Sequence, residues 1–305
     1  MKKLLLFIII SLLSLVEIAQ GYEIVVVKSS LSKVNERIQY TFINELDKRV
    51  PHHGLKSIQP HQLTEIILSQ EKETRESIRK IQNTHPDLIL ALGSKALKVA
   101  LSVPDIPIVH LLVIDPEKII GTATNVSGVA LSIPPKVQLD EMTRYCPTVK
   151  RVGIIYDPKR NSGFVKQLES IRSDLEFISL AAGNVDEVPG LINSLHGKVD
   201  LLWMLPDPTT TNQKTIQSYI LFSIKNRIPL LTFSEKFLNY GATIAVTFDT
   251  NAIAEQAADL AMDMLSRRAG GDKASIVPPR VKTVINHKMV AKLNISMVSK
   301  EFSND

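Results

Sequence analysis

The chain has 305 residues, 44% of them hydrophobic and 22% charged, and a formal net charge of +5. This composition is typical of a soluble globular protein, and the length suits two compact domains. The nine Phe, six Tyr and one Trp are not interleaved with basic clusters, so the sequence argues against a nucleic-acid-binding surface.

The N-terminal residues predict an export signal. Lys2 and Lys3 precede an apolar run at residues 4–16, and Ala-Gln-Gly at residues 19–21 offers the small side chains that a signal peptidase requires. We therefore expect residues 1–21 to be a signal peptide, cleaved near Gly21, and the mature protein to be periplasmic. The apolar run is shorter than the roughly 20 residues of a membrane span, although an uncleaved anchor stays an alternative. No Cys directly follows the run, so we do not expect a lipoprotein.

In the first half of the chain, short apolar runs alternate with helical patterns. Several of these runs are apolar throughout, which is typical of strands covered on both faces by helices in a parallel sheet. We expect strands at 23–27, 55–58, 88–92 and 108–113, and helices at 34–48, 62–82 and 95–102.

The second half repeats this alternation. We expect strands at 152–156, 177–180, 201–205 and 230–233, and helices at 164–175, 185–195 and 211–226. Residues 125–135, which include Gly128 and two prolines, read as the connection between the halves. The sequence therefore predicts an α/β protein of two units in tandem, which a hinge could close around a ligand.

Polar residues directly follow the predicted strands. Ligands of open parallel sheets bind beyond the carboxyl ends of the strands, so these residues are the candidate ligand-binding set. They are Ser29, Ser30, Gly93, Ser94, Asp115, Tyr156, Asn161, Asp207 and Ser234. Ser and Asp are also ordinary helix N-caps, and this alternative stays open at each position.

Within that set, the turn at Gly93 joins a strand directly to a helix. Such a turn directs free backbone N–H groups and the positive end of the helix dipole toward a ligand, so we expect it to hold an acidic group together with the neighbouring serines. We expect Tyr156 to pack on the body of the ligand. Asp207 would pair with an ammonium group, and Asn161 and Ser234 would complete that side.

Five segments stand in a characteristic order: ALGSKAL at 91–97, IPIVHLLVIDP at 106–116, NVSGVALSIPPKVQLDEM at 125–142, VKRVGIIYDPKRNSG at 149–163 and IPLLTFSEKFLNYGA at 228–242. In amino-acid sequence and in order, these segments resemble the substrate-binding proteins of ABC transporters of the tryptophan/tyrosine-binding type, a branch of the type I periplasmic-binding fold. The resemblance extends from Tyr22 to about Ile295.

The resemblance implies two hinged, Rossmann-like lobes with parallel sheets. An amino acid or similar small solute would bind between them and pass to an ABC permease in the inner membrane. The chain would cross between the lobes three times. The implied first lobe is 22–127 with 245–276, and the implied second lobe is 128–244 with 277–305. We expect a monomer.

Enzymatic motifs are absent from the sequence. It contains no Gly-x-Ser-x-Gly elbow, phosphate-binding loop, dinucleotide fingerprint or His-Glu-x-x-His pair. We therefore expect no enzyme, no catalytic residues, no cofactor and no metal, although His52, His53 and His61 leave metal binding as a minor alternative. Cys146 and Trp203 read as core residues. A periplasmic ligand-sensing module for a signalling partner and a cleft hydrolase are the alternative functions.

Overall fold

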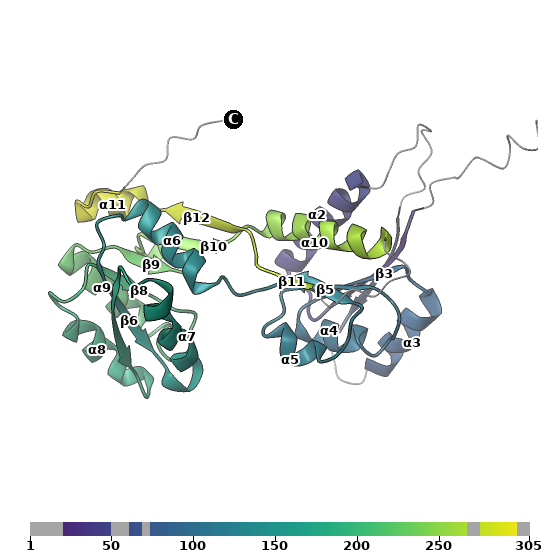
Figure 1. Ribbon diagram of the computed structural model, residues 1–305, viewed down its shortest axis with the longest axis horizontal. Helices are drawn as coiled ribbons and strands as arrows, with labels where there is room; N and C mark the ends of the chain where they lie inside the picture. The colour runs from purple at the N-terminus through teal and green to yellow at the C-terminus, as the bar shows by residue number, and fades with distance from the viewer. Residues whose placement is uncertain (1–20, 50–60, 69–73, 267–274, 298–305) are drawn as a thin grey trace, which may run out of the picture. The chain divides into compact units, whose positions relative to one another are not determined.

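The computed structural model describes residues 21–49, 61–68, 74–266 and 275–297. Residues 1–20 of the predicted export signal and the predicted strand at 55–58 lie outside these residues. Among the described residues, no helix combines the length and the apolar character needed to cross a membrane. The chain divides into two compact units: the first holds the described residues up to Ser132 and those from Thr250 to Pro279, and the second holds the rest (Figure 1).

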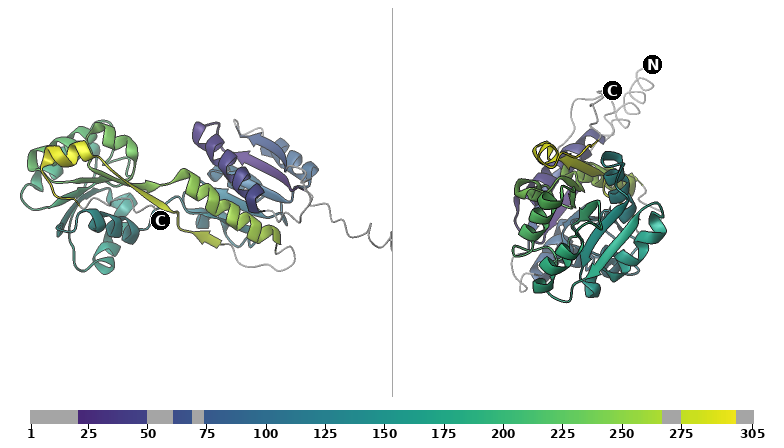
Figure 2. Two further views of the ribbon diagram at one scale, coloured as in Figure 1. Left: turned by 90° about the horizontal axis from the view of Figure 1, so that it is seen from above. Right: turned by 90° about the vertical axis from the view of Figure 1, so that its left-hand side faces the viewer.

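The first unit is a parallel sheet with the strand order β11-β5-β4-β3-β1-β2. Helices α2 and α10 lie side by side over one face, and α3, α4 and α5 lie on the other (Figures 1 and 2). The strands are β1 (Glu23–Lys28), β2 (Gln62–Ile67), β3 (Leu88–Leu92), β4 (Ile108–Leu111), β5 (Val126–Val129) and β11 (Ser275–Val277). The helices are α2 (Lys33–Arg49), α3 (Thr74–Thr84), α4 (Ser94–Ala100), α5 (Pro116–Ile120) and α10 (Thr250–Ser266).

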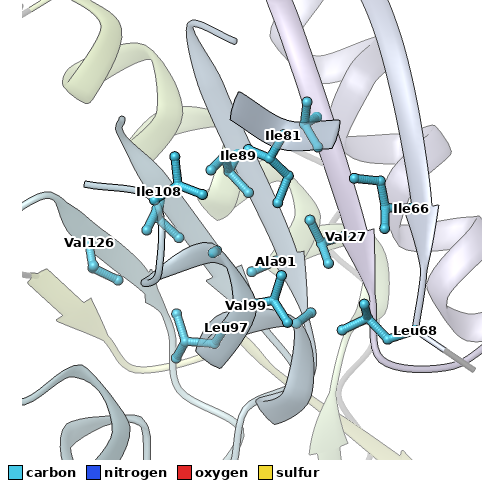
Figure 3. Packing of buried hydrophobic residues seen from close by; sticks show 14 of the residues in the cluster. Val27, Ile66, Leu68, Ile81, Ile89, Ala91, Leu97, Val99, Ile108 and Val126 are labelled. Carbon is cyan, nitrogen blue, oxygen red and sulfur yellow. The ribbon is translucent and has the colours of Figure 1, made fainter. Parts of the chain in front are cut away.

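The core beneath α3 and α4 shows why these strands form. Val27, Ile89 and Ile108 project from neighbouring strands and pack against Ile81 and Leu97 of the helices (Figure 3). Each such side chain contributes about 1.5–3 kcal/mol when fully buried. Every residue of β3 is buried, because helices cover both faces of the sheet. The prediction from its continuous apolar run is therefore confirmed.

The second unit has the strand order β12-β10-β9-β8-β6-β7, parallel except for β12, which runs antiparallel to β10. The strands are β6 (Arg151–Tyr156), β7 (Glu176–Ala181), β8 (Leu201–Trp203), β9 (Leu230–Thr232), β10 (Ile244–Phe248) and β12 (Val281–Ile285). The α-helices are α6 (Pro135–Tyr145), α7 (Pro158–Ile171), α8 (Val188–Ser194), α9 (Ile216–Asn226) and α11 (His287–Leu293), and the 3-10 helices are η2 (Val185–Glu187) and η3 (Glu235–Tyr240).

Two expected core residues of the second unit are buried. Trp203 is fully buried in β8, with its ring centroid 5.4 Å from that of Phe164 in an edge-to-face arrangement. Cys146 follows α6 and joins the same apolar cluster. Burial raises the pKa of the Cys146 thiol to about 11, so the residue stays a neutral packing group at neutral pH.

Two local predictions are wrong. The helix expected at 62–82 begins only at Thr74, and Gln62–Ile67 is strand β2, paired with β1 along its whole length. Its apolar residues alternate: Ile66 faces the core while Leu63 and Ile67 face solvent, which is the period of an edge strand. The segment at 125–135 is also more than a connection, because it contains β5.

The strand pairings also move the boundaries between the units. Residues 128 and 129 lie in β5 of the first sheet, and Val277 pairs with Val129 there. Strand β10 pairs with β9 and β12, so the second unit keeps residues 245–248, which the family resemblance implied for the first lobe. The chain passes between the units after residues 132, 249 and 279.

Candidate functional site

The carboxyl ends of three neighbouring strands form the rim of the first unit. Ser29 follows β1, and its amide donates to the carbonyl of Leu92 in β3 at 2.9 Å. Gly93 follows β3, and its amide donates to the carbonyl of Leu111 in β4 at 2.8 Å. These bonds extend the sheet ladder past the strand ends and hold the three strand ends side by side.

Gly93 and Ser29 fit together at this rim. Gly93 has a φ of +94°, and a Cβ at this position would lie 2.6 Å from Ser29 Oγ, so the turn requires glycine. The hydroxyl oxygen of Ser29 accepts a hydrogen bond from the amide of Ala96 at 3.0 Å. Ser29 therefore caps the first turn of α4 from a different strand, as an N-cap serine would. The capping alternative is correct for Ser29.

The remaining amides of that turn stay available. Among the described residues, no group accepts a hydrogen bond from the backbone amides of Ser94 and Lys95, and Gly93 has no side chain to cap them. Ser94 is half-buried and begins α4 at its positive end. The rim thus offers two N–H donors and the Ser94 hydroxyl to an anionic group.

The loop after β1 is tied to α2. The side-chain amide of Asn35 donates to the carbonyl of Ser30 at 2.6 Å, and its backbone amide donates to Ser32 Oγ at 3.1 Å. The Ser30 side chain is exposed. Asn35 therefore fixes the backbone at Ser30, and the Ser30 hydroxyl has no hydrogen-bond partner among the described residues.

Asp115 stands apart from these groups. It lies in a loop after β4 where Leu112 and Asp115 both have left-handed backbones, with φ of 58° and 46°. Its carboxylate is 58% exposed and lies 2.6 Å from the ammonium of Lys118. The sequence assigned no binding role to Ile114, which precedes Asp115, is 68% exposed in the same loop and gives the rim an apolar surface. An apolar residue directly after a buried strand was the signal for it.

The rim of the second unit is organised around Asp207. Its Oδ2 accepts from the amide of Asp157 at 2.8 Å and from the side chain of Asn161 at 2.7 Å. Its Oδ1 accepts from the amides of Thr209 and Thr210 at 2.9 and 3.3 Å. The residue is only 2% exposed. The carboxylate expected to bind an ammonium group thus already holds four donors and joins the loops after β6 and β8.

Asp157 completes this network. It caps α7 by accepting from the amide of Lys159 at 2.9 Å, and it accepts from the hydroxyl of Thr209 at 2.7 Å. The Thr209 hydroxyl, followed by the Lys159 amide, lowers the pKa of the Asp157 carboxyl below its ordinary value. The sequence placed Asn161 and Asp207 on one side of a site, and the structure brings them into direct contact.

The other two predicted residues of this rim lie separately. Tyr156 ends β6 half-buried and packs against the apolar cluster beneath α6 and α7. Ser234 precedes η3, is half-buried, and gives η3 no side-chain cap. Neither side chain has a recorded hydrogen bond to another predicted site residue among those described.

Of the three histidines considered as metal ligands, the structure describes His61. His61 Nδ1 accepts from the amide of Tyr22 at 2.9 Å, and its ring stacks on the Tyr22 ring. His52 and His53 lie outside the described residues. Across the described part of the chain, no three His, Cys, Asp or Glu side chains gather closely enough to hold a metal ion.

The chain is similar to proteins of a known family. Residues 54–301 match the family described as ABC transporter substrate binding protein. The tyrosine-binding protein of Clostridioides difficile (strain R20291) is 24% identical over 238 residues, which cover 74% of this chain and 68% of that relative.

Solved structures show the same fold. The ligand-free, open structure of a substrate binding protein with adhesive properties from Clostridium difficile matches with a TM-score of 0.76 and 19% identity, covering 93% of this chain and 97% of that one. A Streptococcus pneumonia domain in complex with L-Trp matches with a TM-score of 0.55 and 16% identity, covering 92% and 96%. The fold is that of type I periplasmic-binding proteins, which confirms the expectation from the sequence.

Proposed function

Because the chain belongs to the family of ABC transporter substrate-binding proteins, we propose that it is the extracytoplasmic solute-binding protein of an ABC importer. It takes up an amino acid or similar small solute without changing it covalently and passes it, as a monomer, to an inner-membrane permease. The observation that carries this proposal is the match of residues 54–301 to that family. The Gly93 turn is compatible with it, because the amides of Ser94 and Lys95 lack an acceptor among the described residues. A carboxylate is the group that such donors hold well.

The first unit is proposed to hold the acidic end of the solute. The amides of Ser94 and Lys95 and the hydroxyls of Ser94 and Ser30 donate to the carboxylate, and Ile114 contacts the apolar part. Ser29 acts through Gly93 and α4, because its hydroxyl oxygen is engaged by Ala96.

The second unit is proposed to complete the site. Tyr156 and Ser234 face the body of the solute. Asp207 is assigned a positioning role, since its carboxylate is buried and accepts four hydrogen bonds. It orients Asn161, whose side-chain oxygen has no recorded donor among the described residues and so can accept from an ammonium group.

The relatives favour an aromatic amino acid as the solute. One curated relative is a tyrosine-binding protein, and one structural relative was solved with L-Trp. We therefore place L-tyrosine and L-tryptophan first among the solutes to be tested.

Isothermal titration calorimetry of the purified protein tests this proposal. L-tyrosine, L-tryptophan and the other common amino acids are titrated in turn, and chromatography of the mixture checks that each is recovered unchanged. We expect saturable binding of at least one of them. Absence of binding by every amino acid, or formation of a product, would contradict the proposal.

A pair of glycine variants locates the site. Gly93→Ala places a methyl group against Ser29 at a left-handed backbone position, and we expect affinity to fall at least about tenfold because the turn shifts. Gly121→Ala is the matched control, because Gly121 also has a positive φ, but a Cβ added there would meet no atom within 4 Å. If both variants lost affinity equally, the loss would come from strain at a positive-φ residue in general, and the Gly93 turn would not be the binding site.

A further inference from the structure

A pocket lies at the outer edge of the first unit, beside the loop that follows β1. Its volume is about 310 Å³, which is at the lower end of the range for small-molecule sites. The end of β1, helix α2 and the edge strand β2 line it. None of the candidate solute-binding residues described above lines this pocket.

The polar groups of the pocket are incompletely paired. The Lys28 side chain is only 3% exposed, and its ammonium lies 3.0 Å from Glu65 Oε2. Gln39 donates to the other oxygen of Glu65 at 2.5 Å, while its own Oε1 is buried and has no donor among the described residues. An ammonium has three donors, so Lys28 keeps donor capacity beyond its bond to Glu65. Buried donors and acceptors are normally paired, so Lys28 and Gln39 suit a group that can both accept and donate a hydrogen bond.

The apolar groups of the pocket are exposed. Leu31 is 63% exposed, Tyr40 is 70% exposed and Leu63 is 43% exposed. They line the same pocket as Lys28 and Gln39. A surface of this kind combines an apolar wall with a few fixed polar groups, which is the usual make-up of a small-molecule site.

We propose that this pocket binds a neutral small molecule that carries a hydroxyl or amide group on an apolar body. The polar group accepts a hydrogen bond from Lys28 and donates one to Gln39, and the body lies against Leu31, Tyr40 and Leu63. Neutrality follows from the charges. Lys28 and Glu65 offset one another, Glu36 on the pocket lining disfavours an anion, and the buried ammonium of Lys28 disfavours a cation.

Phenol is a suitable probe, since it joins one hydroxyl to an apolar ring. The backbone amide spectrum of the ¹⁵N-labelled protein is followed while phenol is added at neutral pH. We expect saturable shifts in residues 28–44 and 62–67, and no comparable shifts with toluene, which lacks the hydroxyl, or with benzoate, which is an anion. Equal responses to phenol and toluene, or no saturable shift in these residues, would overturn the proposal.

Two variants test the assigned contacts. Gln39→Leu removes the buried acceptor, and Tyr40→Ala removes an exposed part of the apolar wall whose loss leaves the core intact. We expect each to weaken phenol binding about fivefold. Gln167→Leu, at an exposed position of α7 in the second unit, is the matched control and should bind phenol as the wild type does. Unchanged affinity in both pocket variants would overturn the assignment. The result is independent of the proposed transport function, because it uses a different pocket and different probes.

Discussion

One buried side chain in each unit illustrates a different way of accommodating an ionisable group. In the first, His110 of β4 is fully buried, and neither ring nitrogen has a hydrogen-bond partner among the described residues. In the second, Asp207 is nearly as buried but accepts four hydrogen bonds. Burial disfavours a charge, so a buried group either becomes neutral or recruits partners. An imidazole can become neutral near physiological pH, whereas a carboxylate needs its donors.

The two rims also differ in how many of their polar groups are hydrogen-bonded within the protein. The Asp207 network joins the loops after β6 and β8, so much of the polar capacity of the second rim is used inside the protein. The first rim leaves the amides of Ser94 and Lys95 without an acceptor among the described residues. The second rim therefore pairs its buried carboxylate within the protein, and the first rim leaves two backbone donors unpaired among the described residues.

The largest expected effect comes from Asp207→Asn. The variant retains the shape but presents an NH₂ group to backbone donors, so we expect the second unit to lose roughly 2–4 kcal/mol of unfolding free energy. The chain has a single Trp, and Trp203 is buried in this unit, so its fluorescence in a urea titration reports the change. Asp186→Asn, at an exposed position of the same unit, is the control and should change the value by less than about 0.5 kcal/mol.

The pH dependence of the first unit should follow His110. Burial lowers its pKa to about 4 from the ordinary value of 6.5, so the unfolded chain binds a proton in this interval that the folded unit does not. His110 therefore leaves the unfolding free energy unchanged above pH 6.5. As the pH falls from 6.5 toward 4, the unfolding free energy decreases by about 3 kcal/mol. Urea titrations followed by circular dichroism at several pH values measure it.

His110→Phe provides the control for this pH dependence. A Cβ at Gly128 would overlap the His110 ring, so the pairing strand leaves room for a planar ring at this position. Phe retains such a ring and cannot be protonated. We expect the pH dependence between 6.5 and 4 to become shallower, and an unchanged dependence would mean that another group is responsible.

A smaller effect is expected from Ser29→Ala. The change removes the acceptor for the Ala96 amide and should destabilise the first turn of α4 by about 1 kcal/mol, as the loss of an N-cap does. Hydrogen exchange of the α4 amides measures it. Ser30→Ala is the matched control, because the Ser30 side chain is exposed and, among the described residues, only the Ser30 carbonyl is hydrogen-bonded. Faster exchange in both variants would contradict the capping role of Ser29.

The smallest effect is expected from Asp115→Asn. The pair with Lys118 is exposed on both sides, with side-chain exposures of 58% and 79%, so water and salt screen it. We expect the unfolding free energy to change by less than about 0.5 kcal/mol. A loss above about 1 kcal/mol in thermal unfolding would show that the left-handed loop depends on this pair.

The sequence predicted the elements whose residues carry their own signal. The continuous apolar run of β3 indicated a strand covered on both faces, and Gly93 indicated the turn after it. Strand β2 could not be recognised in the same way. It is an edge strand with exposed Leu63 and Ile67, and its pattern becomes clear only when Ile66 is seen to face the core.

Within the candidate site, the residue types were predictable and their partners were not. Asn161 and Asp207 stood out because they follow strands of a parallel sheet. The buried position of Asp207 could not be foreseen, because its donors at Asp157 and Asn161 come from the N-cap and first turn of a helix about 50 residues earlier in the chain. The same holds for Ile114, whose exposure depends on the backbone of its loop.

The sequence by itself determined the α/β class, the order of most strands and helices, the family and the turn at Gly93. These features depend on hydrophobic periodicity, on a glycine and on the order of short segments, all of which can be read directly from the sequence. Tertiary structure alone decided that Ser29 caps a helix 67 residues away, that Gly128 lies against the His110 ring, and that Asp207 is enclosed by donors. These contacts join segments that are distant in the chain. They depend on the order and register of the strands, which no local pattern specifies.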